Sequence, residues 1–274
     1  MSKEGEENEG PIGATLEPLF TYGVKPNVYG GIHFTRSDTL LYPSGCGISL
    51  YSMKDKNQEL VPLADKGKHL TAIGKSQKSQ SSHKNDKKKC LAGVNKNRKL
   101  VAFAEHGDRP YVIVFDLELR RRRKVLRCAE FVSQEVISLA FSHDSKYLLA
   151  QGGPPDYSLV YFFWEKNKVI TTLKNLSTSK NPVTQVSFHP RDRSVVCIVG
   201  QGIFKMCRLT EGVLKQFGFQ KAEHHSMICH DWIGTRHVLI GTKVGKILIM
   251  EDAELKQSVD ILGLIENFGF EWKF

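Results

Sequence analysis

The sequence predicts an all-β protein built from the four-stranded blades of a β-propeller. A pattern of apolar and polar residues returns five times, short strand-like runs alternate with turn residues, and no segment shows a long helical period with caps. Four antiparallel strands in a unit of about 40–45 residues are typical of a propeller blade. One blade cannot bury both of its faces, so successive blades are expected to stack around a common axis.

Each copy of the repeat consists of an apolar anchor, a polar turn and a second apolar run. The clearest copy runs from Phe141 to Ala150 and contains the turn Ser142-His143-Asp144-Ser145, whose Ser and Asp side chains favour tight turns. The interval between the first two anchors is longer than the others, and we attribute the difference to a lysine-rich insertion. The five anchors are Phe34, Val94, Phe141, Phe188 and Trp232.

A third apolar strand is expected in every copy, followed by a more polar fourth strand such as 168–173. The third strands are expected at 48–51, 112–115, 160–164, 204–207 and 247–250. Trp164 and Trp232 are interpreted as packing between blades and not as parts of ligand sockets. The residues expected in the blade cores are Phe34, Val94, Phe115, Phe141, Trp164, Phe188 and Trp232.

The blades are expected to occupy residues 21–260, with three segments outside the repeat. Residues 1–20 are acidic and are expected to be disordered. A Lys- and Ser-rich insertion at about 66–89 is expected to form a disordered loop on the blade rim or between blades. Residues 261–274 are apolar but match no blade, so this tail is expected either to be unstructured or to cap an exposed blade edge.

Composition indicates a soluble globular protein. The 274 residues are 41% hydrophobic and 25% charged, and the six cysteines are widely spaced without a CxxC pair. This spacing favours reduced thiols over a disulfide framework. No apolar run is long enough to span a bilayer, and the acidic start resembles neither a signal nor a transit peptide. A cytoplasmic protein is therefore expected.

Positive charge is concentrated in two runs within a chain of net charge +10. Residues 66–89 contain eight lysines and one acid, and residues 120–127 contain six bases. Such runs can keep an outer strand exposed to solvent and block its pairing with other strands. Alternatively, they can bind an acidic surface such as a tubulin tail or a phosphorylated protein. Nucleic acid is not expected, because no base-stacking aromatic module accompanies the charge. The candidate partner-binding residues are Arg120, Arg121, Arg122, Arg123, Lys124, Arg127, Lys84, Lys87, Lys88 and Lys89.

Three groups of residues are interpreted as structural. His224, His225, Cys229 and His230 lie around a strand start, where alternate side chains point to opposite faces and cannot converge on zinc. His143 and Asp144 are neighbours in a turn, and no GxSxG elbow is present. The segment 241–246 has the wrong glycine spacing for a phosphate loop and is read as a hairpin turn. No catalytic residue, metal ligand, cofactor or small-molecule substrate is therefore expected.

Residues 137–149 resemble WD-repeat sequence, and Trp164-Glu165 stands where that family usually ends a strand in Trp-Asp. More narrowly, the stretches 147–151, 159–161, 164–166, 181–188, 202–205 and 211–216 resemble the amino-terminal propeller of the cilia- and flagella-associated protein 57 family. The resemblance covers roughly 21–250 and is strongest from 123 to 216. Rings of this kind tend to have seven or so blades, so about five blades imply an incomplete ring.

The resemblance implies a non-catalytic scaffold of the ciliary or flagellar axoneme. Members of this family anchor inner-arm dyneins and regulatory complexes on doublet microtubules, so the implied partners are axonemal, tubulin-associated or dynein-associated proteins in a larger complex. The family continues into a second propeller and a coiled coil, and neither is expected within these 274 residues. The alternative is a cytoplasmic propeller adaptor that binds anionic membrane lipids or a different protein complex, although no Phe-Arg-Arg-Gly motif of lipid-binding propellers is found.

Overall fold

The structure is a computed structural model of the chain. It describes residue 20 and residues 23–25, 28, 30–35, 38–45, 47–62, 70–75, 100–106, 110–129, 131–174, 176, 180–218 and 225–261. Among these residues, no helix has the length and apolar character needed to cross a membrane.

The described residues form five four-stranded antiparallel sheets, each made from four consecutive strands. Blade 1 contains β1 (His33–Phe34), β2 (Thr39–Ser44), β3 (Gly47–Ser52) and β4 (Asn57–Pro62). Blade 2 contains β5 (Leu70–Lys75), β6 (Leu100–Glu105), β7 (Val112–Asp116) and β8 (Arg121–Leu126). Blade 3 contains β9 (Val136–Phe141), β10 (Tyr147–Gly152), β11 (Leu159–Phe163), the 3-10 turn η1 (Trp164–Lys166) and β12 (Lys168–Leu173). Blade 4 contains β13 (Val183–Phe188), β14 (Val195–Gly200), β15 (Ile203–Thr210) and β16 (Val213–Phe217). Blade 5 contains β17 (Met227–Ile233), β18 (His237–Thr242), β19 (Lys246–Glu251) and β20 (Glu254–Asp260).

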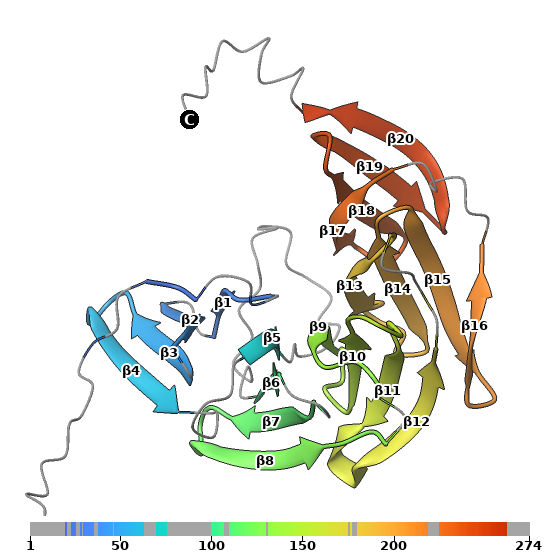
Figure 1. Ribbon diagram of the computed structural model, residues 1–274. Coiled ribbons are helices and arrows are strands. Elements are labelled where there is room, and N and C mark those ends of the chain that lie inside the picture. Colours follow the sequence, from blue (N-terminus) through green and yellow to red (C-terminus); the bar gives the residue numbers. More distant parts are fainter. Residues whose placement is uncertain are drawn as a thin grey trace, which may run out of the picture.

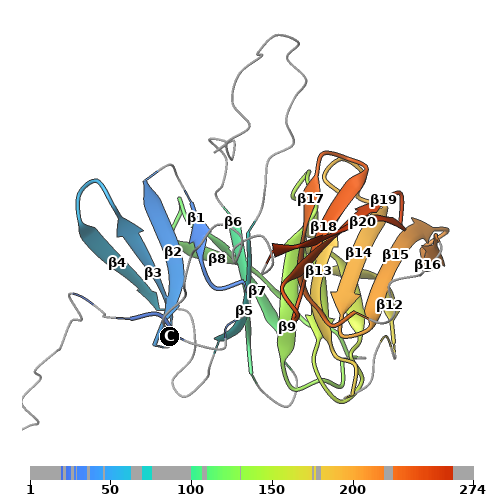
Figure 2. The same cartoon turned by 90° about the horizontal axis from the view of Figure 1, so that it is seen from above.

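The blades follow one another around an arc, and the ring is not closed (Figure 1). The first strand of each blade lies on the inner, concave side of the arc, and the fourth strand lies at the outer rim. The view turned by 90° shows the sheets standing side by side (Figure 2). The prediction of an all-β propeller with about five blades in an incomplete ring is confirmed.

Alternating side chains explain why these sequences stack as blades. In blade 3, Leu148 and Ala150 of β10 pack against blade 2, while Leu149 between them packs against blade 4. Both faces of a middle blade are thus buried, which accounts for near-continuous apolar runs such as those of β10 and β14. Four apolar clusters lie at the four successive blade junctions.

Inner strands of neighbouring blades approach each other very closely. A Cβ atom added to Gly74 of β5 would lie 2.6 Å from the carbonyl oxygen and 2.7 Å from the Cβ of Leu139 in β9. No side chain fits at that distance, so glycine is the residue that lets the backbones of blades 2 and 3 converge near the axis.

Most of the residues expected in the blade cores are buried. Phe115, Phe141, Trp164 and Phe188 are between 3% and 7% exposed and belong to the junction clusters. The indole Nε1 of Trp164 donates a hydrogen bond to the carbonyl oxygen of Ser145, at 2.6 Å. Trp232 is half-buried against the cluster between blades 4 and 5.

The expectation of a core position for Phe34 is wrong, since its side chain is 46% exposed. Phe34 pairs with Leu40 of β2, and the adjacent His33 pairs with Leu41. Leu41 is fully buried against blade 2. Because neighbouring residues of a strand point to opposite faces, Phe34 lies on the face of blade 1 that is turned away from blade 2.

The expected insertion at 66–89 is also wrong in part, because residues 70–75 form the inner strand β5. Leu70 and Ile73 are each 2% exposed and pack in the cluster between blades 1 and 2. Because lysines flank this short apolar run, it was assigned to the lysine-rich insertion and not to a strand. The insertion instead separates β5 from β6 within one blade.

The second anchor was therefore misplaced. Lys75 pairs with Val101 in blade 2 as Phe141 pairs with Leu148 in blade 3, so Lys75 and not Val94 holds the equivalent position at the end of the inner strand. Val94 itself lies outside the described residues, as do residues 1–19 and 262–274.

Candidate protein-interaction surface

The six bases of residues 120–127 lie on and beside β8, the outer strand of blade 2. The hairpin that leads into β8 is closed by Asp116, whose Oδ1 accepts hydrogen bonds from the amides of Glu118 at 3.0 Å and Leu119 at 2.9 Å. Arg120 ends this turn with φ +51°, and its guanidinium pairs with the carboxylate of Glu59 in β4. The turn is thus fixed both to its own strand and to blade 1.

Residues 121–125 of β8 are all exposed, whereas Leu126 is 1% exposed and anchors the strand in the cluster between blades 2 and 3. Arg127 follows directly, and its guanidinium carbon lies 5.1 Å from the centre of the Tyr111 ring. This is a cation–π distance. Four bases lie between the paired Arg120 and the stacked Arg127. We call these four residues, Arg121, Arg122, Arg123 and Lys124, the basic strand.

A β-bulge determines which faces carry the charge. Arg121 pairs with Asp116 and Lys124 pairs with Val114, so Arg123 is the extra residue in the register. Asp116 and Val114 are two residues apart and share a face, so Arg121 and Lys124 share it as well. Val114 belongs to the cluster between blades 2 and 3. Arg122 pairs with Phe115, which belongs to the cluster between blades 1 and 2, and therefore lies on the opposite face.

The four lysines predicted to bind partners from the insertion, Lys84, Lys87, Lys88 and Lys89, lie outside the described residues. Among the predicted partner-binding residues, the structure therefore brings together only those of the run 120–127.

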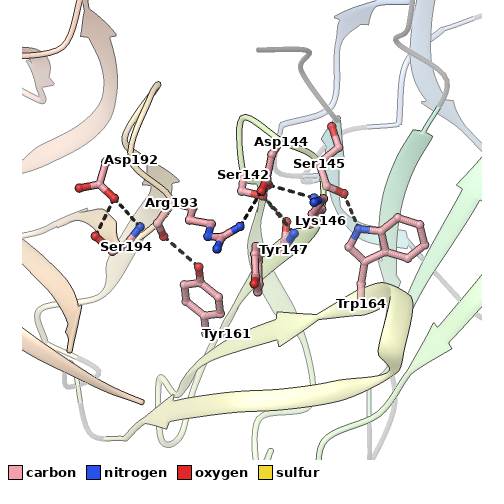
Figure 3. Close-up of polar contacts among 10 residues, drawn as sticks. All are labelled: Ser142, Asp144, Ser145, Lys146, Tyr147, Tyr161, Trp164, Asp192, Arg193 and Ser194. Carbon is pink, nitrogen blue, oxygen red and sulfur yellow. Dashed lines mark hydrogen bonds and ion pairs between the residues drawn. The ribbon is translucent and has the colours of Figure 1, made fainter. Parts of the chain in front are cut away.

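Polar contacts join the turns of blades 3 and 4 (Figure 3). Asp144 accepts hydrogen bonds from Ser142 Oγ at 2.5 Å, from the amide of Lys146 at 3.1 Å and from Arg193 at 3.1 Å. Partial burial alone would raise the pKa of Asp144, but these hydrogen bonds together hold it below its ordinary value. Arg193 belongs to the turn of blade 4, so Asp144 links two blades.

Tyr161 strengthens the same junction. Its hydroxyl donates to the carbonyl oxygen of Arg193 at 2.9 Å, and the Arg193 guanidinium lies 4.9 Å from the centre of the Tyr147 ring. The interpretation of the His143-Asp144 turn as structural is supported by these contacts. The sequence gives no sign that Arg193 reaches the preceding blade, because the contact joins turns 49 residues apart.

The described members of the histidine and cysteine group do not converge on one point. His230 is 5% exposed and its Nε2 lies 2.6 Å from Ser187 Oγ in blade 4. Cys229 is exposed, and it pairs with Gly241 while His230 pairs with Ile240, so the two side chains lie on opposite faces. His224 lies outside the described residues. Within the described part of the chain, no cluster of three or more His, Cys, Asp or Glu side chains could hold a metal ion.

The segment 241–246 forms the hairpin turn between β18 and β19. Thr242 Oγ1 donates to the carbonyl oxygen of Lys246 at 2.9 Å and accepts from its amide at 3.0 Å, while Gly245 takes φ +73°. The prediction of a turn at this place is confirmed.

The concave side of the arc contains a cavity of about 520 Å³ lined by inner strands of all five blades. Its polar lining includes Gln185, Ser187 and His230. These groups bond to one another or to backbone across the junction between blades 4 and 5. Arg121, Arg123 and Lys124 of the basic strand, by contrast, are exposed at the outer rim of blade 2, away from this cavity.

Comparisons with known proteins show that the chain is similar in sequence to proteins named as cilia- and flagella-associated. No protein-family model matches the chain. Cilia- and flagella-associated protein 57 of Mus musculus is 33% identical over 249 residues, which are 90% of this chain and 18% of the mouse protein. The chain is a WD-repeat-type propeller similar to cilia- and flagella-associated protein 57.

Two further relatives have related names. Cilia- and flagella-associated protein 43 of Chlamydomonas reinhardtii is 24% identical over 82% of this propeller and 14% of its own length. Cilia- and flagella-associated protein 44 of Mus musculus is 23% identical over 88% of this propeller and 12% of its own length. This propeller thus spans less than a fifth of each of these relatives.

Solved structures support the fold. The structure of U3-55K matches 92% of this propeller and 69% of that chain with a TM-score of 0.62 and 14% identity. A chain of the mitotic checkpoint complex matches 94% of this propeller and 75% of that chain with a TM-score of 0.63 and 10% identity.

Proposed function

We propose that this propeller is a non-catalytic scaffold of the ciliary or flagellar axoneme that holds other proteins in fixed positions. The observation that carries the proposal is the 33% identity to cilia- and flagella-associated protein 57 over 90% of the chain. In the finer form of the proposal, the propeller helps to anchor or assemble inner dynein arms and regulatory complexes on doublet microtubules.

The construction of the blades supports a positional mechanism. Each blade junction buries an apolar cluster, and side chains such as Arg193 and His230 add polar contacts between neighbouring blades. A platform of this kind resists deformation, because close-packed interiors transmit strain and do not deform smoothly. Partners bound to different blades are then held at fixed spacing without any chemical step.

Location in a motile ciliated cell tests the proposal. A tag on the endogenous protein is expected to remain with axonemes after detergent removes the membrane, and depletion of the protein is expected to reduce inner-arm dynein on those axonemes. Release of the tagged protein with the detergent-soluble cell body would contradict the scaffold role.

The exposed cations of β8 favour one second candidate, an adaptor for anionic membrane lipids. Detergent extraction separates the two, because a lipid-bound adaptor is expected to leave with the membrane and an axonemal scaffold is expected to stay.

A further inference from the structure

Three members of the basic strand, Arg121, Arg123 and Lys124, carry positive charge that the described carboxylates do not pair with. Elsewhere in the blades, Arg193, Arg208 and Arg236 each form an ion pair with a carboxylate. No described carboxylate pairs with Arg121, Arg123 or Lys124. Like charges so close together on one strand repel and destabilise it. An acidic partner would relieve this repulsion by pairing with the charges.

The strand also offers a free edge. β8 is the last strand of its sheet, and among the described strands it pairs with β7 alone. Basic side chains on an edge oppose pairing with uncharged or basic strands, but they attract an acidic one. The edge is therefore selective for the charge of the chain that approaches it.

The spacing of the charges fits an extended chain. The bulge at Arg123 places Arg121 and Lys124 on the face toward blade 3, with Arg122 on the other face. An extended peptide carries its same-face side chains about 7 Å apart and alternates them between two faces. Such a peptide running along β8 brings carboxylates beside Arg121 and Lys124 on their shared face, and the Arg121 guanidinium can bind a carboxylate through two parallel hydrogen bonds.

We propose that the basic strand binds an acidic, glutamate-rich segment of another protein in extended conformation, through ion pairs to Arg121, Arg123 and Lys124. This proposal rests on the proposed function to the extent that the partner is a protein. It names the chemistry of the segment that the scaffold holds.

Charge distribution favours a peptide over a membrane or a nucleic acid. A bilayer offers no backbone that can pair with a strand, whereas an extended peptide can add to the outer edge of β8 while its carboxylates meet the cations. Nucleic acid binding uses aromatic rings on which bases stack, and Tyr111, the ring beside this run, is 9% exposed and covered by Arg127.

Fluorescence anisotropy with the purified chain tests the proposal. The probe is a labelled twelve-residue peptide of alternating Glu and Thr, and its comparison is the same peptide with Gln in place of Glu. The triple variant Arg121→Gln, Arg123→Gln, Lys124→Gln is expected to bind the Glu peptide at least ~10-fold more weakly, and wild-type binding is expected to weaken from 50 to 300 mM salt. Equal binding by the wild type and the triple variant would overturn the proposal.

The matched control removes the same charge from other outer strands. Lys168, Lys215 and Lys256 are exposed on β12, β16 and β20. Lys168→Gln, Lys215→Gln, Lys256→Gln is expected to keep wild-type affinity, because the net charge changes equally but the basic strand is intact. The double variant Arg121→Lys, Arg123→Lys keeps the charge but removes the planar guanidinium groups, so its affinity for the Glu peptide is expected to fall ~3-fold. An equal loss in the control would show general charge attraction and contradict the proposal.

Vesicles containing phosphatidylserine and a single-stranded RNA of twelve nucleotides complete the experiment. If the wild type binds the vesicles or the RNA more tightly than the Glu peptide, and the triple variant loses that binding, the proposal of a peptide partner is overturned in favour of a membrane or an RNA. If the triple variant no longer binds the Glu peptide but the tagged protein is absent from axonemes, the peptide site is supported and the proposed axonemal function is contradicted. If the triple variant binds the Glu peptide as tightly as the wild type and the tagged protein remains with axonemes, the axonemal function is supported and the peptide site is rejected.

Discussion

At the residue scale, buried and partly buried polar side chains connect blades 4 and 5. The side-chain amide of Gln185 spans the backbone of His230, accepting from its amide at 2.8 Å and donating to its carbonyl oxygen at 3.0 Å. The indole of Trp232 donates to Ser187 Oγ at 2.9 Å, and that hydroxyl also contacts His230. Because His230 is only 5% exposed, a change in its charge bears directly on stability.

Burial lowers the pKa of His230 to about 4. In the unfolded chain an ordinary histidine has a pKa of about 6.5, so the unfolded state gains the proton first as the pH falls. Stability is therefore expected to decrease from pH 6.5 to pH 4, by on the order of 3 kcal/mol from this group. His230→Gln is expected to remove that part of the slope in urea unfolding followed across this range. Identical slopes for variant and wild type would contradict the buried neutral imidazole.

Tyr161 provides a second residue-scale prediction. Tyr161→Phe keeps the buried ring but leaves the carbonyl oxygen of Arg193 without its donor, so a loss of about 1 kcal/mol of unfolding free energy is expected. Tyr147→Phe is the matched control, because the contacts of Tyr147 with Tyr161 and Arg193 are made by its ring. Equal effects of the two variants in chemical denaturation would argue against the bond across the junction.

Close contact between inner strands dominates at the scale of elements. Gly74→Ala places a methyl group against the backbone of Leu139 and is expected to cost more than about 2 kcal/mol, because backbone cannot move aside cheaply. Gly153→Ala is the control, since its new Cβ meets the Glu135 side chain at 3.0 Å and that side chain can shift. Thermal unfolding of both variants measures the difference, and a Gly74→Ala variant as stable as the control would contradict the packing of β5 on β9.

Strands could be predicted from the sequence where local pattern decides them. All five third strands and the turn before Tyr147 follow from short apolar runs between turn residues. β5 was missed because its apolar core, Leu70 to Ile73, is short and lies among lysines, and the repeat was then aligned on Val94. The side of a strand that faces a neighbour depends on which blade lies there, so the exposure of Phe34 could not be predicted locally.

The candidate surface was found in the sequence as a run of bases, but its geometry was not. Composition alone indicates that residues 120–127 are strongly basic. The bulge at Arg123, the pairing of Arg120 with Glu59 and the stacking of Arg127 on Tyr111 depend on register and on blade 1. These contacts engage Arg120 and Arg127, so the candidate surface centres on Arg121, Arg123 and Lys124.

Stacked sheets organise the whole molecule. Each of the four junctions buries its own apolar cluster, and the two end blades each have one face without a described neighbour. Exposed apolar side chains mark these end faces, with Phe34 of blade 1 at 46% and Ile233 of blade 5 at 54% exposure. The stiffness on which the proposed scaffold depends therefore comes from the interior junctions.

A double-mutant cycle across one interior junction tests this stacking most directly. The rings of Tyr161 in blade 3 and Phe188 in blade 4 meet edge to face, with centroids 5.3 Å apart and an angle of 86°. Replacing both by Leu, singly and together, is expected to give a coupling of about 1 kcal/mol in unfolding free energy, whereas Tyr161 and Phe103, which belong to different junctions, are expected to be additive. Additivity of Tyr161 and Phe188 within about 0.3 kcal/mol would contradict the stacking of successive blades.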